Sequence, residues 1–172
     1  MAYEQRTDVH ETDILLTLGN ITACYTLLDR PEAALDLGRK IYARKCALSH
    51  LLDTESIFIT AANLANQLNA LGRFGECISF AVEIITDAMR ALGPEHGLTM
   101  TIQNIYANAL CNCPDATLRD MQLAVVTMEG CVQTSNRVMG KTHPRTLESE
   151  RFLDFARMKL AAEEARTGLA AL

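Results

Sequence analysis

Apolar and small side chains recur along the chain at helical spacing, in three segments that match one another. Counted from Ala34, Cys77 and Ala124, they return four, seven, eight and fourteen residues later. This spacing places them on one face of an amphipathic helix. The recurring positions are Gly38/Ala81/Met128, Ile41/Ile84/Cys131, Tyr42/Ile85/Val132 and Leu48/Ala91/Val138. We therefore predict three equivalent helices that each bury this face.

The spacing of these segments predicts an internal repeat. Cys77 follows Ala34 by 43 residues, and Ala124 follows Cys77 by 47 residues. A Pro-Asp pair in "CNCPDATL" marks a loop near residues 111–117, where we place an insertion of four residues in the third copy. The predicted repeats and the helix that follows them are 10–52, 53–95, 96–142 and a capping helix at 143–166.

Each predicted repeat contains a first and a second helix. The expected first helices are 12–28, 55–71 and 98–112, the second helices 31–51, 74–92 and 118–139, and the last helix 144–166. Residues typical of helix boundaries agree with these ranges: Gly72, Gly93 and Gly140 after helices, Pro31 and Pro144 at helix starts, and a capping-box pattern at Thr117 and Asp120. The expected fold is all-α, an α-solenoid of antiparallel helical hairpins in a single domain over residues 1–172.

Composition supports a globular helical protein and argues against nucleic acid as a partner. Apolar residues make up 49% of the chain, aromatic residues only 5%, and Trp is absent, so the core must be aliphatic. The formal net charge of −5 disfavours phosphate binding. We interpret the basic cluster of Arg39, Lys40, Arg44 and Lys45 as a solvated helix face.

Neither a membrane span nor a targeting segment is predicted. No apolar run approaches the roughly 18–20 residues that cross a bilayer. The N-terminal "MAYEQRTDVHETD" is polar and acidic, unlike a signal or transit peptide. We expect a soluble intracellular protein, cytoplasmic by default, with an organelle as the alternative.

The six cysteines do not follow a metal-binding pattern. Only Cys111 and Cys113 are close in sequence, and C-x-C differs from the C-x-x-C of zinc sites. We expect reduced thiols and no bound metal, with Cys77 and Cys131 in the core. A thiol redox or metal role for the Cys111/Cys113 pair is a minor alternative to loop packing.

No arrangement of residues indicates catalysis. The sequence shows no pattern for a nucleophile with its base, for a carboxylate pair on a shared face, or for a glycine-rich phosphate loop after a strand. We therefore expect no enzymatic activity and no cofactor.

Several phrases resemble the kinesin-light-chain-like class of tetratricopeptide (TPR) repeats. That class reads L-G-x-x-H-P-x-T-L, then an Asn-Leu-Ala segment, then G-R-y-x-E-A. "LGPEHGLTM" and "MGKTHPRTL" resemble the first part, "NLANQLNALGRFGEC" the second and third, and "GNITACYTLLDRPEAA" matches more loosely. His96 is followed by Gly instead of Pro, and Asp53 stands where the later copies have His96 and His143. We interpret both histidines as helix-capping or packing residues.

The resemblance implies a peptide-binding groove on the first helices. In TPR proteins, Asn side chains there hold the backbone of a partner, since one amide both donates and accepts hydrogen bonds. The matching candidates are Asn20, Asn63, Asn66, Asn104 and Asn108, with Gln67 and Arg73 at the groove edge. The alternative is that these amides bond within the array and tie neighbouring helices together.

Two functions remain open from the sequence. The first is a non-catalytic protein–protein interaction module that binds a partner peptide or helix on the concave face. The second is a structural or scaffolding subunit of a larger assembly, since short repeat arrays expose apolar surface at their ends.

Overall fold

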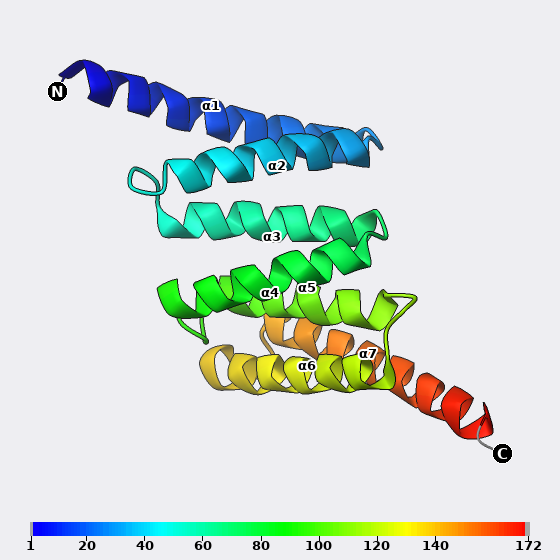
Figure 1. Cartoon of the computed structure of the whole chain (residues 1–172). Coiled ribbons are helices and arrows are strands. Elements are labelled where there is room, and N and C mark those ends of the chain that lie inside the picture. The colour runs from blue at the N-terminus through cyan, green and yellow to red at the C-terminus, as the bar shows by residue number, and fades with distance from the viewer. Residues whose placement is uncertain (1, 171–172) are drawn as a thin grey trace. The chain divides into compact units, whose positions relative to one another are not determined.

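The computed structural model describes residues 2–170, with side chains from 10 to 168. This part of the chain forms seven α-helices and no strand (Figure 1). They are α1 (Ala2–Leu27), α2 (Pro31–Ala47), α3 (Thr54–Ala70), α4 (Phe74–Ala91), α5 (Gly97–Asn112), α6 (Leu118–Met139) and α7 (Pro144–Ala170). The all-α prediction is confirmed. Helix α1 begins ten residues before the predicted start, because no Gly or Pro interrupts residues 2–18.

The helix starts follow the repeat spacing seen in the sequence. Helix α4 begins 43 residues after α2, and α5 begins 43 residues after α3. Helix α6 has six residues ahead of Ala124, whereas α2 and α4 each have three ahead of Ala34 and Cys77. The third copy therefore has an α6 that begins about one turn earlier relative to Ala124, and the loop before it, residues 113–117, is longer than the loop of residues 71–73.

Local signals set most helix ends. Gly72, Gly93 and Gly140 adopt positive φ angles of 69°, 97° and 86°, which glycine tolerates without a steric penalty. Asp29 occupies the equivalent turn between α1 and α2 with φ 55°, the one non-glycine residue with positive φ among those described. The capping box is present, because Thr117 Oγ1 accepts from the Asp120 N–H at 3.2 Å while Asp120 Oδ2 accepts from the Thr117 N–H at 2.8 Å.

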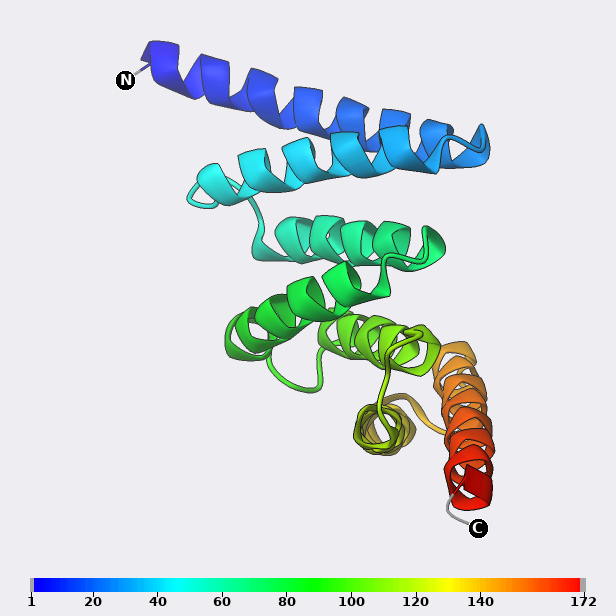
Figure 2. The ribbon, with the colours of Figure 1, turned by 45° about the vertical axis from the view of Figure 1, so that its right-hand side comes forward.

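The chain divides into two compact units, residues 1–71 and 72–172. In the first unit, α2 packs against both α1 and α3, and the three helices lie side by side in antiparallel order (Figures 1 and 2). Its buried side chains include Leu15 from α1, Leu35 and Ile41 from α2, and Phe58 from α3.

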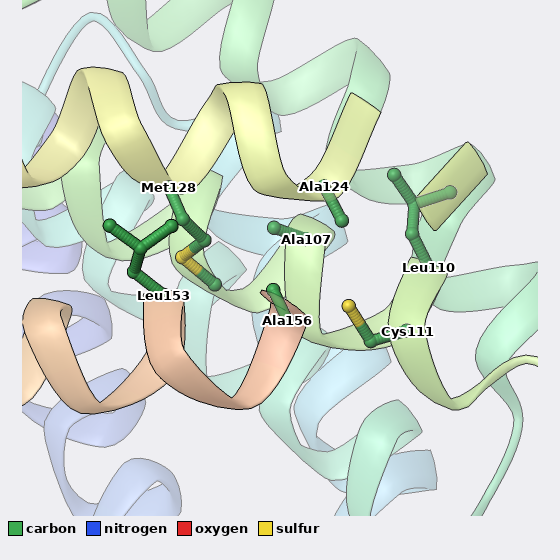
Figure 3. Packing of buried hydrophobic residues seen from close by; sticks show 7 residues of the cluster. All are labelled: Ala107, Leu110, Cys111, Ala124, Met128, Leu153 and Ala156. Atoms are coloured by element: carbon green, nitrogen blue, oxygen red, sulfur yellow. The ribbon is translucent and has the colours of Figure 1, made fainter. Parts of the chain in front are cut away.

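In the second unit, α5 packs against α4 and α6, and α7 packs against α6 and α5. Figure 3 shows the core where α5, α6 and α7 meet, with side chains from all three helices directed toward one another. The cluster consists of Ala107, Leu110 and Cys111 from α5, Ala124 and Met128 from α6, and Leu153 and Ala156 from α7. Small residues at the crossing points allow the helices to approach closely.

The repeated Gly-x-x-His-x-x-Thr phrase joins one repeat to the next. The buried Thr99 hydroxyl donates to the Gly93 carbonyl at 2.8 Å, and His96 Nδ1 accepts from the Leu98 N–H at 3.2 Å. The second copy repeats both contacts, from Thr146 to Gly140 at 2.9 Å and from the Arg145 N–H to His143 at 3.2 Å. The capping role predicted for both histidines is therefore correct.

The junction between α2 and α3 lacks this phrase and uses a lysine instead. Ser56 stands at the position of Thr99, and Lys45 Nζ donates to its hydroxyl oxygen at 2.8 Å and to its carbonyl oxygen at 3.1 Å. Lys45 is only 7% exposed, and burial lowers its pKa. The prediction that Lys45 belongs to a solvated face is wrong, because its hydrogen bonds to Ser56 hold the ammonium group inside the junction. Arg39, Lys40 and Arg44 are exposed as expected.

One predicted row of the buried stripe is also wrong. Ala91 and Val138 are exposed and Leu48 is half-buried, while the rows nearer the helix centres are buried or half-buried. Ala91 and Val138 lie in the last turns of α4 and α6, and Leu48 lies just past the end of α2. Helical periodicity identifies a face, but it does not show how far along that face the neighbouring helix reaches.

Candidate functional site

A groove between α1 and α3, within the first unit, brings together three of the predicted binding residues. Its volume is about 420 Å³. We call it the amide groove, and its lining consists of Gly19, Ala23, Thr26 and Leu27 from α1 with Asn63, Asn66 and Gln67 from α3.

The wall formed by α1 is built from small side chains. Gly19, Ala23, Thr26 and Leu27 follow one another at the spacing of a single helix face. A Cβ atom added at Gly19 would meet no atom within 4 Å, so the space in front of this glycine is open. Thr26 donates its hydroxyl to the Thr22 carbonyl at 3.2 Å, which satisfies that donor within the helix. This wall therefore offers room and few polar groups.

The wall formed by α3 carries three amides. Asn63 and Asn66 are exposed, and Gln67 is half-buried. The Gln67 Oε1 atom is buried and has no hydrogen-bond partner within the described structure. It lies 2.8 Å from the position that a Cβ on Gly38 would occupy, so the glycine in α2 makes room for the Gln67 amide. A buried carbonyl oxygen without a donor costs about 1–3 kcal/mol.

Asn20 lies on α1, exposed, one residue beyond Gly19, and is outside the groove lining. The sequence aligns it with Asn63, but only Asn63 contributes to the lining.

The remaining predicted residues lie in the second unit and contact neighbours within it. Asn104 donates to Ser149 Oγ of α7 at 3.4 Å, and its own Oδ1 is buried without a partner. The Asn112 side-chain amide donates to the backbone carbonyl oxygen of Asn108 at 2.9 Å and to its Oδ1 at 3.3 Å. Arg73 precedes α4 and forms an exposed ion pair with Glu76 at 2.6 Å. Asn104 thus makes a contact between helices, as in the alternative to partner binding, whereas the Asn108 contact lies within α5.

The cysteines in the structure are free thiols. Burial raises the pKa of Cys77 and of Cys131 to about 12, and it also raises the pKa of Cys111. Cys111 belongs to the core cluster of the second unit, whereas Cys113 is half-buried just beyond α5. A raised pKa suppresses the reactive thiolate form. Among the described residues, no group of His, Cys, Asp and Glu has an arrangement that would hold a metal ion.

Sequence reasoning missed the α1 side of the groove. Gly19, Ala23, Thr26 and Leu27 were not among the predicted site residues, although their spacing marks a helix face of mostly small residues. A search for small residues on the first helix, opposite the amides of the next one, would have found them.

No helix in the described part of the chain is long and apolar enough to cross a bilayer.

The fold is similar to that of known repeat proteins. No family model and no curated protein sequence matches the chain. Among solved structures, the TPR-like repeats of a kinesin light chain from Podosopora anserina match with a TM-score of 0.70 and 20% identity, covering 89% of this chain and 76% of that one. A variant of the same protein with one substituted residue matches with a TM-score of 0.67 and 20% identity, over 90% and 76% of the two chains.

These matches confirm that the chain has a TPR-like helical repeat fold, as the sequence resemblance implied. A fold of this kind is typical of protein-interaction modules, which present helix faces to other polypeptides.

Proposed function

We propose that this protein is a non-catalytic interaction module that binds a segment of a partner polypeptide in the amide groove. Three amides on one face of α3, opposite a wall of small residues on α1, are the observation that supports this function. Asn63 and Asn66 together offer donors and acceptors that match a peptide backbone whatever its side chains.

A peptide backbone carries an N–H donor at every residue except proline, and the exposed side-chain amides of Asn63 and Asn66 can accept from it. The open space before Gly19 and the groove volume of about 420 Å³ leave room for a chain against α1. A partner segment of a few residues, bound through its backbone, is the occupant that fits these features.

The net charge of −5 supports a polypeptide over a nucleic acid as the partner, because phosphate contacts require a basic surface. The raised pKa values of Cys77, Cys111 and Cys131 argue against thiolate chemistry at these three residues.

The test is a paired substitution on the α3 wall. Peptides of about twelve residues, selected from a random display library against the whole chain, serve as the probe. Each hydrogen bond contributes about 0.5–1.5 kcal/mol, so Asn63→Ala with Asn66→Ala should weaken peptide binding at least about five-fold. Gln122→Ala with Gln133→Ala, which removes two exposed amides from α6, is the control and should leave the affinity unchanged.

Circular dichroism and thermal melting accompany the titrations, because both Asn residues are exposed and their loss should not change folding. Full affinity in the Asn63/Asn66 variant would refute groove binding and leave the scaffolding role as the remaining function.

A further inference from the structure

The first helices carry no acidic or basic side chain over most of their length. Residues 14–28 of α1 and its turn, 56–72 of α3 and its turn, and 97–114 around α5 contain no Asp, Glu, Lys, Arg or His. The polar residues in these stretches are Asn, Gln, Thr, Ser, Tyr and Cys. Charged residues make up 22% of the whole chain, so three such stretches do not follow from the overall composition.

Charges are concentrated on the other helices instead. The second helices and α7 carry the charged partners of most ion pairs in the described structure, such as Arg90 with Asp87 and Arg157 with Glu129. In the first unit, Arg44 of α2 pairs with Glu11, which precedes the uncharged stretch of α1. Exposed polar positions of the second helices therefore take charges as well as neutral groups, such as Gln122 and Gln133 on α6, whereas the three stretches of the first helices take only neutral polar groups.

The lining of the amide groove has the same neutral character. None of its seven residues is ionisable. Asp29 and Arg30 are the first charged residues after the neutral stretch of α1, and the Arg30 guanidinium lies over the Tyr25 ring, 5.1 Å from its centre. A cation–π contact of this kind already engages the arginine.

A charged side chain would bind poorly in such a groove. It would lose part of its hydration and find no opposite charge, and burying an unpaired charge costs several kcal/mol. Neutral side chains lose less on transfer, and hydroxyl or amide side chains would also bond to Asn63 and Asn66. The desolvation cost of a charged segment therefore makes the groove selective against such segments without any additional contact.

We infer that the amide groove selects an uncharged segment of its partner, and that this binding is insensitive to salt. The inference rests on the proposed function and adds the chemical class of the ligand. Salt weakens binding where opposite charges meet, and the groove lining provides no charge for that attraction.

The experiment uses the peptides selected from the random library of about twelve residues. Those whose affinity falls in the Asn63→Ala/Asn66→Ala variant are assigned to the groove, and their binding is measured by fluorescence polarisation. Positions of each peptide that contact the groove are located by alanine scanning and then replaced, one at a time, by Asp, Lys or Asn.

We expect Asp and Lys to weaken binding at least about ten-fold, since a penalty of about 1.4 kcal/mol already has that effect, and Asn to be tolerated. Raising NaCl from about 50 mM to about 500 mM should change the affinity less than about two-fold, because no ion pair is screened. Groove-dependent peptides with an Asp, Glu, Lys or Arg at the contact positions, or with strongly salt-dependent binding, would overturn the inference and leave the proposed function intact. If no selected peptide depends on Asn63 and Asn66, the proposed function fails and the inference fails with it.

Discussion

Adding a side chain to the α1 wall of the amide groove should lower peptide affinity without lowering the stability of the fold, which makes it a sharper test than removing side chains. Gly19 lies within α1, is exposed, and lines the groove. A Cβ at this position meets no atom within 4 Å, so the leucine of Gly19→Leu starts into open space at the groove wall. The same change should make the protein more stable and less able to bind.

The gain in stability follows from helix propensity. Glycine in a helix interior costs about 0.8–1.0 kcal/mol relative to alanine, and leucine is nearly as favourable as alanine. Gly19→Leu should therefore raise the free energy of unfolding by about 1 kcal/mol. For a chain of this size that corresponds to a rise in Tm of about 2–4 °C.

The loss in binding follows from the size of the groove. The added side chain occupies part of a space of about 420 Å³ that a peptide must share. A peptide that can no longer reach Asn63 and Asn66 loses two hydrogen bonds, each contributing about 0.5–1.5 kcal/mol. We expect affinity to fall at least about five-fold.

Gly130→Leu is the matched control. Gly130 is an exposed glycine in the interior of α6, and a Cβ there also meets no atom within 4 Å. This substitution should produce a similar gain in Tm and leave peptide affinity unchanged. Thermal melting and fluorescence polarisation measure both quantities on each variant. Undiminished binding by a stabilised Gly19→Leu protein would show that the groove is not the binding site.

Two further substitutions test the structure independently of any partner. Asp29→Gly should raise the free energy of unfolding by about 1 kcal/mol, because Asp29 adopts a positive φ of 55° at the position where the equivalent Gly72 has φ 69°. An unchanged or lower Tm in a thermal melt would contradict a strained turn. Burial raises the Cys77 pKa from 9.0 to about 12, so the unfolded thiol ionises first, and the stability present below pH 9 is lost as the pH rises toward 12. Cys77→Ala introduces the residue found at the equivalent positions Ala34 and Ala124. In urea unfolding, the free energy of unfolding of this variant should fall between pH 7 and pH 10 by about 1 kcal/mol less than that of the native chain. Equal losses in the two proteins would exclude the Cys77 thiol as the cause.

The helices and their ends were predicted from the sequence because local forces decide them. A left-handed turn favours glycine, a first helical turn tolerates proline, and a capping box satisfies its own amides, wherever the rest of the chain lies. Gly72, Gly93 and Gly140 therefore marked the ends of three helices, and Thr117 with Asp120 marked the start of α6. The repeat phrase belongs to the same class, since its His and Thr bond to groups within six residues.

The candidate site was predicted only in part because it depends on two helices at once. The amide wall of α3 was identified by Asn63, Asn66 and Gln67, but which α1 residues face it depends on how α1 rotates against α2. The repeat register aligns Asn20 with Asn63 and made it a candidate, whereas the structure places Gly19 and Ala23 in the groove lining.

By itself, then, the sequence determined what each segment can do alone: form a helix, end it at a glycine, and carry neutral amides on the first helices and charges on the second. Only the tertiary structure decided which side chains meet. It placed Lys45 against Ser56, Asn104 against Ser149, and an open space before Gly19. Hydrogen bonds and packing between helices depend on distances between segments that are far apart in the chain. These distances are set only when the helices pack together, so no local sequence pattern contains them.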